Sequence, residues 1–232
     1  MKNNANHYDG WELEHFDSSE NFRKYQYSLI SKFIGSDVAE VGPGNGSNAK
    51  MYIKNCKTLE LFEPEKKLYL NLKKIFKKYK KVKIKNKIFK IAKNKYNTIL
   101  YLDVIEHIKN DKYEISKAYQ SLKKNGFLVI NVPAFQILYS KFDNDIGHKK
   151  RYVKNDFLRL SKNLKFEIHY MKYYDSIGFF LSLISKFFSF EYKKNFKLKI
   201  KIWNFLINIS RIIDYLFAYS FGKSLLVIIK KK

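Results

Sequence analysis

The sequence predicts an α/β fold in which a central sheet of mostly parallel strands is flanked by helices. Short apolar runs rich in β-branched and aromatic residues alternate with amphipathic segments, and a glycine-rich turn directly follows the first run. This alternation is typical of a doubly wound sheet. With 232 residues, 46% of them hydrophobic, the chain is long enough to bury a core, and we expect residues 1–232 to form a single domain.

Seven segments are predicted as strands. They are 37–41, 58–63, 81–89, 97–103, 127–133, 166–174 and 224–230. The run 127–133 is apolar enough to be covered on both faces, as a strand inside a parallel sheet would be. Most intervals between the strands carry apolar residues at helical spacing.

The predicted helices begin with an N-terminal helical cap, residues 1–35. In it Phe22, Tyr25 and Leu29 share one face, and Gly35 ends the helix. Further helices are expected at 47–55, at 68–79 and in the segment that is closed by Asn125 and Gly126.

The charge and cysteine content limit the classes of function. The net charge is +25, and residues 66–95 hold fourteen lysines and no acid, but arginine occurs at only four positions and no nucleic-acid-binding module is recognisable. We therefore attribute the lysines to compositional bias on solvated faces and expect no nucleic-acid partner; a basic nucleic-acid-binding or -modifying protein is the alternative from another class. Cys56 is the sole cysteine and the N-terminus lacks the apolar core of a signal peptide, so we expect a cytoplasmic protein.

The glycine-rich turn is the segment "AEVGPGNGSN", residues 39–48. Gly42, Gly44 and Gly46 follow the first predicted strand and open a helix, at the edge of the sheet where doubly wound proteins bind ligands. Glycines there allow a tight turn and let a ligand lie against bare backbone. The spacing differs from the dinucleotide fingerprint, in which two residues separate the last two glycines.

Together with Glu40 before the glycines and Glu63 at the end of the second strand, this turn resembles the class I S-adenosylmethionine-dependent methyltransferases. The resemblance implies a Rossmann-like sheet of seven strands whose last strand is antiparallel. It also implies that the loop packs on the methionine part of the cofactor and that Glu63 binds both ribose hydroxyls. A carboxylate can accept two hydrogen bonds from a diol.

The stretch "NTILYLDVIEHIKND", 97–111, resembles the fourth-strand motif of that family. The resemblance implies that Leu102 and Asp103 touch the methionine end of the cofactor and that the following residues face the acceptor. Many relatives carry an acid after the third strand to bind the adenine amino group, whereas this chain has Asn86 and Lys87 there.

The stretch "VPAFQILYSKFDNDIGHKKRY", 132–152, resembles a subgroup of the family found with glycosyltransferases of surface-polysaccharide pathways. The resemblance implies O-methylation of a sugar or a lipid-linked glycan. A small aromatic or quinone-like hydroxyl is the alternative acceptor. Arg151 and Tyr152 are the candidate substrate-binding residues, because both can hydrogen-bond sugar hydroxyls or a phosphate.

Three residues are candidates for removing the acceptor's proton: His107, His148 and Glu106. His107 is the expected base and His148 the second choice, since neutral imidazole is available near pH 7. The spacing of Asp103, Glu106 and His107 is similar to one that holds a divalent metal in ubiquinone-pathway O-methyltransferases, but we expect no metal. The alternative structural interpretation has Glu106 at the N-terminus of a helix and His107 packed beneath the sheet edge.

A helical, amphipathic insertion is predicted at 176–221, before the last strand. It is rich in aromatic residues and lysines, and charges interrupt both of its apolar stretches, so neither is expected to span a membrane. Such helices either lie on an anionic membrane surface or form a lid or an interface. A peripheral contact at the inner face of the membrane is therefore one expectation, and the sequence indicates no oligomeric state.

Overall fold

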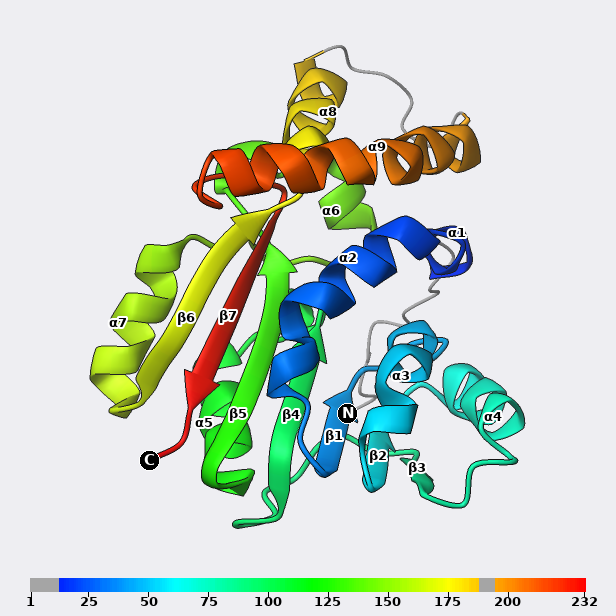
Figure 1. Cartoon of the computed structure of the whole chain (residues 1–232), viewed down its shortest axis with the longest axis vertical. Helices are drawn as coiled ribbons and strands as arrows, with labels where there is room; N and C mark the ends of the chain where they lie inside the picture. The colour runs from blue at the N-terminus through cyan, green and yellow to red at the C-terminus, as the bar shows by residue number, and fades with distance from the viewer. Residues whose placement is uncertain (1–12, 188–194) are drawn as a thin grey trace, which may run out of the picture.

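The computed structural model describes residues 13–187 and 195–232 and contains the predicted seven-stranded sheet (Figure 1). The strands are β1 Asp37–Val41, β2 Thr58–Phe62, β3 Val82–Lys85, β4 Tyr96–Leu102, β5 Leu122–Pro133, β6 Glu167–Tyr174 and β7 Ser224–Lys230. Their order is β3-β2-β1-β4-β5-β7-β6, and β7 runs antiparallel to the other six strands. This is the seven-stranded sheet with an antiparallel last strand that the sequence predicted.

Helices cover both faces of the sheet. The longer ones are α2 Glu20–Ile30, α3 Ser47–Tyr52, α4 Lys66–Ile75, α5 Asp111–Ser121, α7 Lys154–Leu164, α8 Ser176–Phe187 and α9 Phe196–Leu216. Two short helices, α1 Leu13–Asp17 and α6 Lys141–Asp145, lie below α9 in the upper half of Figure 1. Helices α1 and α2 fall within the predicted cap, and α8 and α9 within the predicted insertion; residues 1–12 and 188–194 lie outside the described part.

The alternation of side chains along the strands builds two cores. Leu100 and Leu102 of β4 face a layer made by α2, α3, α4 and α9, whereas Ile99 and Tyr101 face α5 and α7. Successive residues of a strand point to opposite faces, so a strand apolar at every position is buried on both sides. The nearly continuous apolar run at 127–133 is explained in this way, because this part of β5 is covered on both faces.

Two predicted boundaries differ from the structure. Helix α5 ends at Ser121, before the predicted end at Asn125 and Gly126, and β5 begins at Leu122. Asn125, with φ 62°, lies in an irregular start of this strand. The residues Ile105–His107 form one 3₁₀ turn, and α5 begins only at Asp111. Glu106 therefore lies in this 3₁₀ turn and not at the N-terminus of α5.

The carboxyl ends of the parallel strands lie at one edge of the sheet. Gly42 follows β1, Glu63 follows β2, Asp103 follows β4 and Asp175 follows β6, while Lys223 precedes the antiparallel β7. Helices α8 and α9 lie across this edge at the top of Figure 1. The site is therefore assembled where strand ends from both halves of the chain meet.

Candidate functional site

A cavity of about 990 Å³ opens at the carboxyl edge of the sheet. Its size suits a cofactor together with an acceptor. Nine of the predicted site residues line it: Gly42, Gly44, Glu63, Leu102, Asp103, Glu106, His107, His148 and Arg151. The other three predicted site residues, Glu40, Gly46 and Tyr152, are buried and do not line the cavity.

The glycines of the loop serve two different purposes. A Cβ on Gly46 would come within 2.6 Å of Phe76 and 2.8 Å of Leu72, and its φ is +76°, so this glycine is required by packing. A Cβ on Gly44 would meet only Leu13, at 3.3 Å, and would otherwise enter the cavity. Gly44 is therefore the position at which a ligand can lie against bare backbone.

The two acids that flank the loop differ in access to the cavity. Glu63 lines it, is buried, and accepts a hydrogen bond from the backbone N–H of Glu65 at 2.9 Å. Burial raises the pKa of Glu63 to about 7. Glu40 is buried beneath the loop, where burial raises its pKa to about 7 and its carboxyl group accepts a hydrogen bond from the Tyr52 hydroxyl. Glu40 thus supports the loop from behind.

The N-terminal helices α1 and α2 hold the glycine-rich loop by a network of hydrogen bonds that the sequence analysis did not predict. Asp17 accepts hydrogen bonds from Asn45 Nδ2 at 2.7 Å and from the Ser47 hydroxyl at 2.5 Å. Arg23 bonds Asp17 and Asn48 through its two terminal nitrogens, at 3.2 and 2.9 Å. Its Nε is buried without a partner among the described residues, and the side chain lines the cavity.

Asp103 turns into the cavity at the end of β4. It has φ 59°, a left-handed conformation that is uncommon for a residue with a side chain and is held here by Asn131, whose Nδ2 donates to Asp103 Oδ1 at 2.7 Å. The surrounding protein raises the pKa of Asp103 by desolvating it. The neighbouring Leu102 completes this part of the wall.

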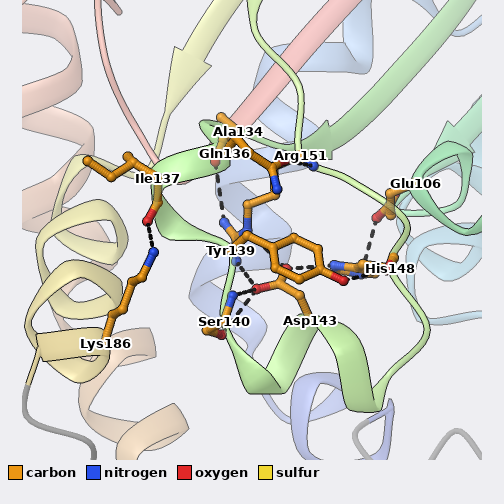
Figure 2. A network of polar contacts seen from close by, with 10 residues as sticks. All are labelled: Glu106, Ala134, Gln136, Ile137, Tyr139, Ser140, Asp143, His148, Arg151 and Lys186. Carbon is orange, nitrogen blue, oxygen red and sulfur yellow. Dashed lines mark hydrogen bonds and ion pairs between the residues drawn. The ribbon is translucent and has the colours of Figure 1, made fainter.

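A chain of polar contacts joins Arg151, Asp143 and His148 (Figure 2). Arg151 Nε and Nη2 donate to the two Asp143 oxygens at 2.9 and 3.0 Å, and Asp143 Oδ1 lies 2.8 Å from His148 Nδ1. Burial would raise the pKa of Asp143, but the bonds and charges of His148 and Arg151 outweigh it and hold the pKa at about 2. Because an ionised carboxylate only accepts, Nδ1 carries a proton, and in the neutral form of the ring Nε2 would be the acceptor.

Glu106 and His107 lie on the other side of His148. Glu106 is fully buried, yet both of its carboxylate oxygens accept no hydrogen bond from the described residues, and Oε1 is 3.6 Å from His148 Nε2. The rings of His107 and His148 are 4.8 Å apart, and burial followed by the charge of His148 lowers the pKa of His107 to about 4. One atom from each of the three side chains falls within 4.8 Å of the others, so this set could hold a metal ion.

Arg151 and Tyr152, predicted to contact the acceptor, differ in their access to it. Arg151 lines the cavity, but three of its nitrogens are bonded to Asp143 and to the carbonyl of Ala134. Tyr152 is fully buried and its hydroxyl donates to Asp111 at 3.0 Å. The structure therefore places Tyr152 in the core and gives Arg151 the position of a support for Asp143.

The cavity wall also contains residues that the sequence analysis did not name: Phe89, Trp203 and Lys223. The Lys223 ammonium lies 4.8 Å from the centre of the Trp203 ring. Asn86, which stands where many relatives carry an acid, donates to the backbone carbonyls of Glu63 and Pro64. Trp203 and Lys223 come from the last part of the chain. Neither has a local motif, because each reaches the cavity only through the insertion before β7.

Comparisons with known proteins agree with this architecture. A family profile described as "Methyltransferase domain" matches residues 13–176. A S-adenosylmethionine-dependent methyltransferase from Archaeoglobus fulgidus has a TM-score of 0.62 at 16% identity, over 95% of this chain and 98% of that one. Phosphoethanolamine N-methyltransferase 2 from Haemonchus contortus, in complex with S-adenosylmethionine, has a TM-score of 0.65 at 14% identity, over 95% of this chain and 57% of that one. No curated protein matches the sequence.

Proposed function

The chain belongs to the methyltransferase domain family and uses S-adenosylmethionine, and from that premise we propose that it methylates an oxygen of a sugar or of a lipid-linked glycan. One observation supports this most: the same cavity is lined by the glycine loop and Glu63 and by a cluster of one buried glutamate and two half-buried histidines. A methyltransferase that acts on a hydroxyl needs a donor site and a proton acceptor in the same space.

The residues present fit the cofactor at the glycine end. The space in front of Gly44 is a cradle that a side chain would fill, and Glu63 is a buried carboxylate with lone pairs that can accept from two ribose hydroxyls. Leu102 and Asp103 would contact the methionine end. Bound S-adenosylmethionine supplies an electrophilic methyl group, so the protein has to align the acceptor oxygen and take its proton.

We assign the proton to His148, with His107 as the second choice. Asp143 orients the His148 ring and fixes its proton on Nδ1, and Arg151 in turn holds Asp143 with two bonds. Nε2 is then the atom that accepts the proton of an acceptor hydroxyl, and the carboxylate stabilises the imidazolium that forms. The sequence favoured His107; we prefer His148 because Asp143 and Arg151 fix the orientation of its ring.

A divalent cation on Glu106, His107 and His148 is the second candidate for this step. It is favoured by the two oxygens of the fully buried Glu106, which accept no hydrogen bond from the residues that the structure describes. Burying a carboxyl group without hydrogen bonds is costly, and a cation would satisfy it. A metal would lower the pKa of an acceptor hydroxyl, and no histidine base would then be needed.

A methyl-transfer assay tests the acceptor. Full-length protein is incubated with methyl-labelled S-adenosylmethionine and with fractionated cell-envelope extract, soluble sugar nucleotides, quinone precursors or nucleic acid. We expect label in the lipid-linked or sugar fraction, in an ether that survives mild base. Label confined to quinone precursors or to nucleic acid would replace the proposed acceptor and leave the methyltransferase activity in place.

A further inference from the structure

Helix α9 has two apolar faces, and the fold uses only one of them. The inner face packs on the rest of the protein through Ile200, Trp203 and Ile207, and Trp203 also lines the cavity. The outer face carries six large apolar residues that are between 48% and 75% exposed: Leu198, Ile202, Phe205, Ile209, Ile212 and Leu216. A water-soluble surface rarely carries so much contiguous apolar area without a partner.

The spacing of these six residues puts them in one line. They are separated alternately by four and three positions, and at 3.6 residues per turn this keeps them within a stripe of roughly 80° along the whole helix. Tyr215 and Phe217, also more than half exposed, widen the stripe at its C-terminal end. Within the described residues, the stripe therefore runs almost the full length of α9.

The charges beside the stripe are all positive. Lys197, Lys199, Lys201 and Arg211 are exposed on α9, whereas its one acid, Asp214, is buried and accepts hydrogen bonds from Tyr25 and from the backbone N–H groups that open α8. An apolar stripe flanked by cations is the pattern of a helix that lies in the surface of an anionic bilayer. No helix of the described part is long and apolar enough to cross a membrane, so the contact would be peripheral.

We infer that the outer face of α9 docks on an anionic lipid bilayer. A second copy of the chain fits less well, because pairing two such stripes would bring lysines together with no exposed acid on either helix to face them. The inference rests on the proposed function and deepens it: because the inner face of α9 supplies Trp203 to the cavity wall, docking of the outer face brings the cavity close to the lipid surface where a lipid-linked acceptor lies.

Vesicle flotation of the full-length chain tests the docking. We expect binding to vesicles of phosphatidylcholine with phosphatidylglycerol at low salt, a loss of about tenfold or more in high salt, and little binding to pure phosphatidylcholine. The double variant Phe205→Glu with Ile209→Glu should reduce partitioning by about tenfold or more, because it buries two charges in the interface. The matched control, Leu70→Glu with Leu158→Glu, changes the net charge equally on exposed positions of α4 and α7 and should bind like the unaltered protein.

Three outcomes would overturn the docking: no binding of the unaltered protein at low salt, equal binding by both double variants, or a dimer that only the α9 variant dissociates. The last result would identify the stripe as an interface between two copies. Binding of S-adenosylhomocysteine, measured on the same samples without vesicles, reports separately on the proposed function. If the protein binds S-adenosylhomocysteine but not vesicles, the docking proposal is refuted and the proposed methyltransferase function is unaffected.

Discussion

Replacing Glu63 by glutamine should stabilise the empty protein at alkaline pH while weakening its affinity for the cofactor. Glu63 is 4% exposed and lies at the end of β2 on the cavity wall. Burial raises its pKa from an ordinary 4.5 to about 7. The amide keeps the size of the side chain and can still accept the Glu65 N–H bond, but it does not ionise.

The raised pKa sets both the size and the pH window of the effect. Below pH 4.5 the carboxyl group is protonated in the folded and unfolded chains, so it contributes no difference. Between pH 4.5 and 7 the unfolded chain loses the proton first, and the folded protein is progressively destabilised; above pH 7 the full cost is reached. A rise from 4.5 to about 7 corresponds to about 3 kcal/mol, at about 1.4 kcal/mol for each pH unit.

Urea unfolding of both proteins at pH 4.5 and pH 8 measures this difference. We expect Glu63→Gln to be more stable by about 2–3 kcal/mol at pH 8 and to match the unaltered protein at pH 4.5. Glu167→Gln, on an exposed carboxylate, controls for the change of charge. Calorimetry should show weaker binding of S-adenosylhomocysteine, by about 1–3 kcal/mol, because an amide cannot accept from both ribose hydroxyls. Equal stability at pH 8, or a less stable variant there, would refute the reasoning.

Two further predictions concern the proton acceptor. His148→Ala should reduce turnover by about a hundredfold or more with little change in cofactor affinity. Asp143→Asn should reduce turnover less, since this substitution removes only the orientation of the His148 ring. Full activity in His148→Ala would assign the proton to His107 or to a metal. Calorimetry with Mn²⁺ alone, together with chelation, tests the cation. Mn²⁺ binding that disappears in Glu106→Gln, with chelator inactivation reversed by added metal, would favour the metal over the histidine base. No Mn²⁺ binding and full activity after chelation would rule out the cation.

The sheet and the position of the glycine turn beside Glu63 and Asp103 could be predicted because their signals are local. Each strand is a short apolar run, and the glycines from Gly42 to Gly46 directly follow β1, where they allow a ligand to approach the backbone closely. The ends of parallel strands meet at one edge in every such sheet, so the sequence alone predicts that Glu63 and Asp103 lie at the same edge. These predictions depended on a handful of residues close together in sequence.

The remaining features depend on contacts between distant segments. Asp17 reaches the loop, and Lys223 reaches the cavity, across much of the chain, and neither belongs to a local pattern. Tyr152 could be read as a hydrogen-bonding residue but not as a buried one, since its partner Asp111 comes from another loop. The spacing of Glu106 and His107 was visible, whereas Asp143 was missed as the residue that orients His148.

Calorimetric titration of the full-length protein with S-adenosylhomocysteine tests the central claim most directly. The structure predicts one binding event for each chain, which Gly44→Val should abolish by filling the space in front of the loop, and which Glu63→Ala should weaken by leaving the ribose hydroxyls unpaired. Thermal unfolding of each variant verifies that it is folded. Absence of binding to the unaltered protein, or unchanged binding in both folded variants, would contradict the assignment of this cavity as the cofactor site.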